Sequence, residues 1–422
     1  MRKVIILFLV LVFGLMLSSC AKNKTEQTFE RKIASGYQFN LVIDEDGHLY
    51  GFGNSMFGVL ANGNSNYGVN DEPILMDSYF DLHDDEYFRS IHAGENHAFA
   101  VTSENRIFTW GHNLNGQTGV THLIEVISSP IEITTYIGLA DDEEIKEWIQ
   151  GDFHTIILTT KHRVLGWGNN QDINLGTNQF NIPIMIGEYE VGPYVLAAAD
   201  LTSYFDLESD ETIISIGLNF ALSSRNRVFG WGKTVSNVDD DQTIQDITEL
   251  ILLEDNENIE KLIDRGNYIQ TTNNRYIISV RQTFPHISTV EYTQFHIHNE
   301  PAIAIELLIS KHGNSVIIDE DHNVWIFGPN DFANLGTGNT FPQFGEIDAT
   351  NPSTFSIAYI PFEWDINWLE NEYIVDIDMS LKNTILLTNK NRIFVMGDNL
   401  FGQIGNGTTD MAYTPQLLVI HD

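Results

Sequence analysis

Cysteine is almost absent from this chain, since Cys20 is the only one in 422 residues. No disulfide bond can therefore form within the chain. The sequence also lacks the Gly-x-Ser-x-Gly motif, which presents a catalytic serine on a sharp turn in many hydrolases. We therefore expect no catalytic residues, and a protein that is not an enzyme.

Basic residues are scarce as well. The chain has 22 Lys and Arg against 58 Asp and Glu, which gives a formal net charge of −36. Such a surface repels nucleic acid phosphates, so nucleic acid is not an expected partner. It also repels anionic lipid headgroups, and it favours cationic partners, divalent ions and solubility.

A single apolar run, residues 4–17, stands at the start of the chain behind Arg2 and Lys3. The run is short for a membrane-spanning helix and is typical of a signal peptide. It ends in Leu17-Ser18-Ser19-Cys20, which resembles the bacterial lipobox. That resemblance implies a signal peptide over residues 1–19, a diacylglyceryl group on Cys20 and a lipidated tether over residues 20–32. The alternatives are an ordinary secretory signal with an incidental cysteine, or an uncleaved anchor.

Internal repetition is the strongest signal in the remaining chain. The clearest copy, residues 91–111, reads as an apolar strand, a polar turn, a second strand and a glycine. The same unit ends at Phe52-Gly53, Trp110-Gly111, Trp167-Gly168, Trp231-Gly232, Phe327-Gly328 and Met396-Gly397. The longest gap, before Phe327, contains a degenerate copy around residues 271–278. We therefore count seven units.

Each unit has the residue types of a tight hairpin. The turn carries glycine, which tolerates positive φ, or Asn and His, which are enriched there: Gly47, Asn105, His162, Asn226, Asn274, His322 and Asn391. The next position is an arginine in five units: Arg106, Arg163, Arg227, Arg275 and Arg392. A ring of ligand-binding arginines is one interpretation. We favour the other, in which each arginine binds carbonyls or acidic neighbours at the end of its hairpin.

A second segment, with asparagine and glycine at recurring positions, follows the hairpin. Its asparagines are Asn113, Asn170, Asn330 and Asn399, and its distal glycines are Gly119, Gly176, Gly336 and Gly405. Glycine permits a sharp reversal there, and amide side chains can satisfy the exposed backbone groups. A phosphate-binding loop would need a strand-to-helix context and a Lys-Ser/Thr pair, and neither is present.

These units resemble the regulator of chromosome condensation repeat family, most closely from Gly94 to Gly119. Its pattern also accounts for His97 and His154, which we expect to make structural hydrogen bonds. The resemblance implies an all-β fold over residues 33–422, a seven-bladed β-propeller with four-stranded blades. We expect the last strand, residues 413–420, to complete the first blade and so close the ring. The fourth unit lacks the Asn-Gly-Gln segment, and long loops at residues 234–241 and 340–366 exceed what a blade needs.

Metal sites find little support. The acidic runs at Asp44 and Asp319 coincide with hairpin turns, and the runs at residues 141–144 and 239–241 fit solvated loops, although weak calcium binding stays open. His296 and His298, with His286 nearby, could share a zinc ion, but no third ligand is identifiable. We expect no metal and no cofactor.

The sequence thus predicts a membrane-anchored lipoprotein on the extracytoplasmic face of a cell membrane. It would be a monomer that acts as a binding scaffold for a protein partner or a glycan. Guanine nucleotide exchange, known in eukaryotic members of the family, is an alternative based on fold analogy alone. Inhibition of a secreted enzyme is a third possibility.

Overall fold

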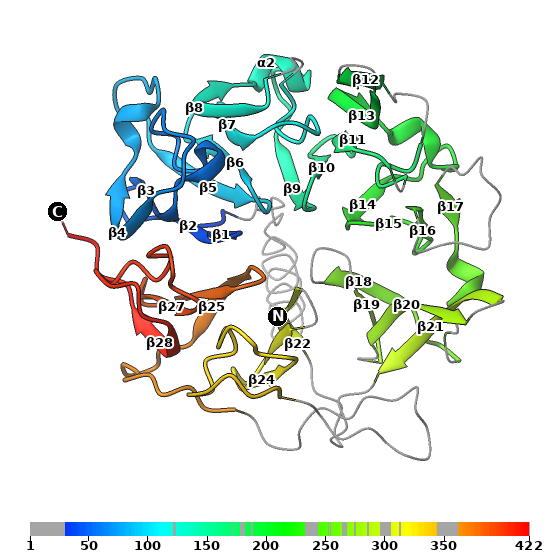
Figure 1. Cartoon of the computed structure of the whole chain (residues 1–422). Coiled ribbons are helices and arrows are strands. Elements are labelled where there is room, and N and C mark those ends of the chain that lie inside the picture. The colour runs from blue at the N-terminus through cyan, green and yellow to red at the C-terminus, as the bar shows by residue number, and fades with distance from the viewer. Residues whose placement is uncertain are drawn as a thin grey trace, which may run out of the picture.

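The computed structural model describes residues 30–120, 124–171, 173–177, 182–186, 189–232, 244–251, 253, 255–263, 268–273, 276–284, 287–295, 305–311, 314–343 and 362–421. Its strands form antiparallel sheets that stand side by side in a ring (Figure 1). None of the helices in this part of the chain has the length and apolar character that a membrane crossing requires.

The first two sheets follow one plan. The first contains β1 (Ile33–Gly36), β2 (Phe39–Ile43), β3 (Leu49–Asn54) and β4 (Val69–Leu75). The second contains β5 (Phe88–Ala93), β6 (His97–Thr102), β7 (Ile107–His112) and β8 (Val126–Glu132). Each strand pairs with its neighbour in sequence, so each sheet is a simple meander.

The next three sheets follow the same plan, except that the third has a fifth strand. The third contains β9 (Ile145–Gln150), β10 (His154–Thr159), β11 (Val164–Asn169), β13 (Tyr189–Asp200) and, outermost, β12 (Ile182–Ile186). The fourth contains β14 (Ile213–Ile216), β15 (Phe220–Ser223), β16 (Val228–Gly230) and the short β17 (Gln245–Asp246). The fifth contains β18 (Ile259–Ile263), β19 (Tyr268–Thr271), β20 (Tyr276–Phe284) and β21 (Ile287–Phe295). The degenerate unit is therefore a hairpin, as predicted.

The last two sheets complete the described chain. One contains β22 (Ile305–Lys311), β23 (Asn314–Asp319) and β24 (Val324–Phe327), and Val324 also bridges to Phe362. The other contains β25 (Ile374–Met379), β26 (Asn383–Thr388), β27 (Ile393–Gly397) and β28 (Ala412–Leu417). The structure confirms an all-β propeller with four-stranded blades. A ring of seven blades stays a prediction, because the β22–β24 sheet has only three described strands.

Short helices occupy some of the connections between strands. They are η1 (Met56–Gly58), η2 (Asp77–Tyr79), α2 (Thr134–Ile137), η3 (Thr202–Tyr204) and η5 (Thr248–Leu250). All but η1 lead from the outer strand of one sheet toward the inner strand of the next.

Proline marks the outer strands. Pro73, Pro130 and Pro415 lie in β4, β8 and β28, and Pro183 lies in the outermost strand β12. Proline cannot donate a ladder hydrogen bond, so an edge strand is where a sheet tolerates it. The proline-containing segments predicted as strands are therefore the edges of their blades.

The ring closes differently from the prediction. The last strand, β28, pairs with β27 inside its own sheet and does not join β1–β4, so the predicted completion of the first blade is wrong. The first and last sheets meet face to face instead. Ile33 and Phe52 pack with Ile385 and Val395 in one buried cluster. Each end of the chain has four strands of its own, so no strand has to be shared.

Polar contacts join the same two sheets. The Arg31 guanidinium lies 3.3 Å from the Asp376 carboxylate and donates to the Ile377 carbonyl oxygen at 2.7 Å. The Asn383 amide donates to Asn40 Oδ1 at 2.9 Å, and the Ser35 amide donates to Asp378 at 2.9 Å. These buried contacts span almost the whole length of the chain and fix the two sheets against each other.

Candidate binding surface

The meander gives the ring two distinct faces. The turns between first and second strands lie on one face with the long connections between third and fourth strands, such as residues 55–68. We call this the loop face. The tight turns between second and third strands, such as residues 44–48, lie on the other face with the connections between sheets. We call this the hairpin face.

The predicted turn positions on the hairpin face have the expected backbone. Gly47, Asn105, His162, Asn226, His322 and Asn391 all have positive φ. The acidic runs at Asp44 and Asp319 are also turns, because each first aspartate accepts backbone N–H groups two and four residues later. Asn274 lies outside the described residues. These carboxylates therefore stabilise the turns that the sequence predicted.

Each described arginine beside these turns joins segments of one blade and of the connection that leads into it. Arg106 contacts Glu86 at 2.7 Å and Glu132 at 2.9 Å, and it donates to the Asp81 carbonyl oxygen. Three arginines repeat the arrangement, each with a buried glutamate and a carbonyl oxygen: Arg163 with Glu143 and Gly138, Arg227 with Glu211 and Asp206, and Arg392 with Glu372 and Asn367. This confirms the structural interpretation for the described copies. Arg275 lies outside the described residues.

The buried glutamates are held in their charged form. Burial opposes ionisation of Glu86, but hydrogen bonds from Thr102, the His83 backbone and the Arg106 guanidinium outweigh it, so the pKa of Glu86 lies below its usual value. Three of the arginines also lie 4.8 Å above the ring of a phenylalanine: Phe108, Phe229 and Phe394. Since each guanidinium is paired with a buried carboxylate and a carbonyl oxygen, these groups support their blades and do not form a ligand-binding ring.

The asparagine segments on the loop face behave as the sequence predicted. Asn399 Oδ1 accepts the Ile404 amide at 2.8 Å, and its Nδ2 donates to the carbonyl oxygens of Thr408 and Asp410. Asn113, Asn170 and Asn330 each accept the amide five residues later in the same way. Each asparagine thus replaces the backbone partners that its loop would otherwise lack.

Tryptophan joins neighbouring blades at these loops. Trp110 Nε1 donates to the Val59 carbonyl oxygen at 2.7 Å, and Trp167 Nε1 donates to the Gln117 carbonyl oxygen at 3.0 Å. Trp231 makes the same contact with Asn174. The Trp-Gly ending of these three repeats therefore serves the interface between blades, which explains why it recurs.

The repeat histidines are structural, but through packing. A Cβ added at Gly94 would lie 2.1 Å from Cε1 of His97, and one at Gly151 would lie 2.3 Å from Cε1 of His154. Neither ring nitrogen of His97 has a hydrogen-bond partner, so the expected hydrogen bonding is wrong there. Burial lowers the pKa of His97 to about 3 and that of His154 to about 4. Both imidazoles are therefore neutral at physiological pH.

Two other blades have phenylalanine at the position of these histidines, which sequence reasoning did not recognise. Phe39 stands three residues after Gly36 and Phe220 three residues after Gly217, the spacing of His97 after Gly94. A Cβ at Gly36 would lie 1.9 Å from the Phe39 ring. The shared signal is the glycine, which leaves room for a flat side chain, whether imidazole or phenyl.

The structure gives little support for metal sites in the described residues. In the run at residues 141–144, Glu143 and Asp142 pair with Arg163 and Lys161. His83, Glu86 and Glu104 lie close together, but Glu86 is already held by a guanidinium, whose charge opposes a cation. The run at residues 239–241, the histidines His286, His296 and His298, and Cys20 lie outside the described residues.

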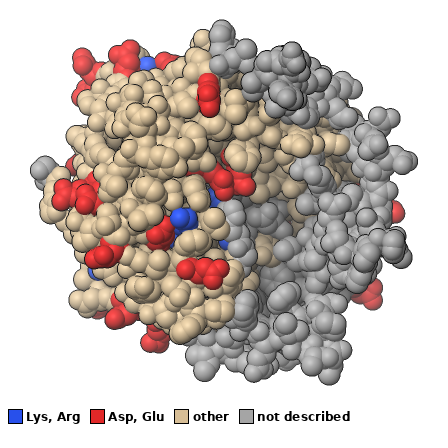
Figure 2. Space-filling model, in the orientation of Figure 1, with Lys and Arg blue, Asp and Glu red and all other residues tan. Residues whose placement is uncertain are grey.

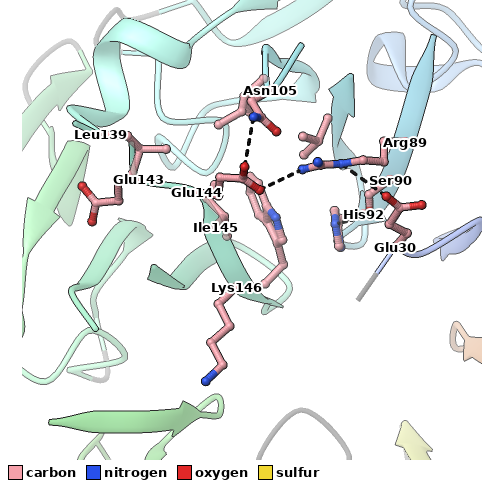
Figure 3. A pocket seen from close by; sticks show the side chains of 13 residues that line it. Glu30, Arg89, Ser90, His92, Asn105, Leu139, Glu143, Glu144, Ile145 and Lys146 are labelled. Carbon is pink, nitrogen blue, oxygen red and sulfur yellow. Dashed lines mark hydrogen bonds and ion pairs between the residues drawn. The ribbon is translucent and has the colours of Figure 1, made fainter. Parts of the chain in front are cut away.

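A small pocket opens between the second and third sheets on the hairpin face (Figure 3). Arg89 bridges Glu30 and Glu144 there, at 3.7 and 3.6 Å. Below them, the His92 ring stacks on Trp148 with centroids 4.9 Å apart. The cavity volume is only about 30 Å³, room for about two water molecules. It is too small for an organic ligand.

Exposed apolar side chains favour the loop face as a binding surface. Among the side chains whose exposure the structure describes, the three most exposed large apolar ones all lie there: Phe341 (71%), Tyr67 (65%) and Leu400 (60%). Leu114, Ile124 and Phe153 are also exposed on this face. Tyr67 stacks on Phe401 at 5.9 Å, so the loops of the first and last sheets form a joint surface. Acidic side chains are scattered over the view in Figure 2, with few basic ones among them.

A ring of antiparallel four-stranded sheets, joined by recurring tryptophan and asparagine contacts, defines a β-propeller built from a sequence repeat. Three stretches, residues 31–68, 88–117 and 150–172, match the family model of the regulator of chromosome condensation (RCC1) repeat. These matches show that the chain contains repeats of this type.

Known proteins resemble the chain over part or most of its length. It is 28% identical over 207 residues to the serine/threonine-protein kinase Nek9 of Xenopus laevis, covering 48% of this chain and 21% of that protein. It is 28% identical over 164 residues to the guanine nucleotide exchange factor SRM1 of Saccharomyces cerevisiae, covering 36% and 31%. The chain thus spans less than a third of these relatives. The crystal structure of Prp20p from Saccharomyces cerevisiae shares the fold, with a TM-score of 0.61, 13% identity and coverage of 94% and 89%.

Proposed function

We propose that this protein is a non-enzymatic scaffold that binds a protein partner through its loop face while a lipid on Cys20 anchors it to a membrane. The exposed apolar side chains on the loop face carry the proposal. Aromatic and aliphatic side chains that monomeric proteins leave exposed together often mark binding surfaces. The net charge of −36 favours a partner with a cationic surface.

The ring of this scaffold has seven blades in our proposal. The β22–β24 sheet has the inner three strands of a blade, and the bridge between Val324 and Phe362 stands where a fourth strand pairs in the other sheets. The inner strands of neighbouring sheets also contact one another, β1 with β5 and β25, and β22 with β25. The outer edge strands β4, β8, β12 and β28 carry proline, which hinders pairing with a second copy and supports a monomer.

The entry of the chain into the ring supports an anchor on the hairpin face. The Arg31 amide donates to Ser90 Oγ at 3.0 Å, and the Ile91 amide donates to the Arg31 carbonyl oxygen, so the chain enters between β5 and β25. Since β1 then runs toward the loop face, the described chain begins on the hairpin face, at Glu30. A lipid at Cys20, on the extracytoplasmic side of the membrane, holds the hairpin face toward the membrane and leaves the loop face accessible to partners.

A second candidate is nucleotide exchange on a small GTPase. It draws on SRM1, whose name is that of a guanine nucleotide exchange factor, and on Prp20p, which has described binding properties toward Gsp1p and histones. An exported protein would not meet cytosolic GTPases, so we place this candidate second. Release of labelled GDP from a GTPase, measured with and without the protein, tests it directly.

Two experiments test the leading proposal. Mass spectrometry of the N-terminus from a membrane fraction, beside a Cys20→Ser control, should show an acylated Cys20; an intact Met1 in soluble protein would exclude the anchor. Cross-linking to surface extracts should identify a partner that Phe341→Asp and Leu400→Asp variants lose. Tyr136→Asp, on the hairpin face, should retain it. Equal capture by all three variants would exclude the loop face.

A further inference from the structure

A second, much larger pocket opens on the hairpin face between the β22–β24 sheet and β25. Its cavity volume is about 570 Å³, within the range of small-molecule sites. The walls come from the turn at His322, from Phe362, and from the connection that leads into β25, which supplies Trp368 and Tyr373. The pocket is separate from the loop face and plays no part in the function proposed above.

Five of the eleven residues that line this pocket carry an aromatic ring. Trp364, Trp368, Phe362 and Tyr373 contribute rings, and the His322 ring stacks on Tyr373 with centroids 3.8 Å apart and planes 8° apart. Trp368 is more than one-third exposed, so part of its ring is open to solvent. The face of an aromatic ring carries negative electrostatic potential, which attracts cations and repels anions.

The charged groups of the pocket also favour a cation. Among the described residues, its lining includes Glu363 and Glu372 and no Lys or Arg. Glu372 is neutralised by Arg392, which lies 2.6 Å away outside the lining, and His322 contacts Glu306 at 3.2 Å. Glu363 is exposed and has no hydrogen-bond or ion-pair partner within the described chain. One unpaired carboxylate therefore stands at the edge of an aromatic pocket.

We propose that this pocket binds an organic ammonium cation on a short alkyl chain, with the cation against the aromatic rings and its charge balanced by Glu363. The ring faces and the Glu363 carboxylate disfavour an anionic ligand, and an entirely apolar ligand would make no use of that carboxylate. A methylated ammonium group fits best, because it is poorly hydrated and loses little on leaving water.

Calorimetric titration of the mature chain with choline tests the proposal against a neutral ligand of the same shape, 3,3-dimethylbutan-1-ol. We expect binding of choline in the millimolar range and no measurable binding of the alcohol. Equal binding of both would show an apolar pocket, and absence of both would show no site; either result overturns the proposal. Sedimentation with phosphatidylcholine vesicles, using the Cys20→Ser chain, then separates a lipid headgroup from a free ligand.

Two matched variants locate the site. Glu363→Gln removes the charge at nearly constant shape, and we expect it to weaken choline binding about fivefold. Glu370→Gln removes a carboxylate from the same connection that does not line the pocket, and binding should stay unchanged. If both variants bind as the wild type does, or both weaken equally, the cation does not sit beside Glu363. Trp368→Leu should abolish binding, and thermal melting checks that each variant is folded.

Discussion

Replacing His97 and His154 by phenylalanine should make the protein markedly more resistant to acid. Both imidazoles are buried and neutral, with the pKa of His97 lowered by burial to about 3 and that of His154 to about 4. In the unfolded chain, each imidazole regains an ordinary pKa near 6.5. The unfolded state therefore binds protons that the folded state cannot, and stability falls as the pH falls below about 6.5.

The size of the effect follows from these pKa values. Between pH 7.5 and pH 5, each histidine should cost about 2 kcal/mol of unfolding free energy, and the pair about 4 kcal/mol. The loss should level off as the pH passes through about 4 for His154 and about 3 for His97, where the folded protein also takes up the protons. Phenylalanine removes the titration, and Phe39 shows that a phenyl ring fits over the equivalent glycine, Gly36, in the first blade.

Urea unfolding at pH 7.5, 6.0 and 5.0 measures the effect. The wild-type midpoint should fall steeply with pH, and the double variant should lose most of that slope. A remainder comes from His112, whose pKa burial also lowers. The exposed His421→Phe variant is the control and should keep the wild-type slope. If the wild type and the double variant lose stability in parallel, the two imidazoles are not the buried neutral groups described above.

Three further substitutions test the contacts between and within blades. Gly94→Ala should lower stability by about 2–3 kcal/mol, because the new Cβ meets a buried imidazole, whereas Gly138→Ala has nothing within 4 Å and should cost about 1 kcal/mol through its positive φ. Thermal melting compares the two, and equal losses would argue against the steric reason. Arg392→Met should lower the unfolding free energy by about 3–5 kcal/mol, because it leaves a buried carboxylate unpaired. Arg225→Met removes an exposed ion pair and should lower it by less than about 1 kcal/mol. Equal urea midpoints for the two variants would contradict the structural role of the repeat arginines. Asn399→Ala should cost about 1–3 kcal/mol through lost backbone partners, and hydrogen exchange should show the Ile404 amide losing protection.

Sequence reasoning succeeded where the cause of a pattern is local. A positive φ at Asn105 or His322 restricts the residue type at that position alone, so the hairpin turns could be read directly. The arginine beside each turn was assigned to nearby carbonyl and carboxylate groups, and Arg106 and Arg392 have those partners. Lipid attachment at Cys20 stays a prediction, because that residue lies outside the described chain.

The repeat pattern in the sequence could not predict contacts between segments that lie far apart along the chain. The unit that ends in Met396-Gly397 lacks the tryptophan that joins blades elsewhere, and the sequence gives no sign of a substitute. Trp364 supplies it, since its Nε1 donates to the Leu335 carbonyl oxygen at 2.9 Å, the same kind of contact that Trp110 makes with Val59. The replacement comes from outside the repeat unit, so only the fold reveals it.

The closure of the ring shows the same limit most clearly. A repeat seen in sequence does not say where one blade ends and the next begins, so the last strand could equally belong to the first or the last sheet. The structure decides the matter through Arg31, which precedes the first strand and reaches Asp376 in the last sheet. Burial raises the pKa of Asp376 above its usual value, although the nearby guanidinium opposes that shift. A buried ion pair with this balance adds little net stability, so its effect is to fix which surfaces meet. A propeller closed by face packing and buried polar contacts needs no shared strand, and its two ends can each form a complete blade.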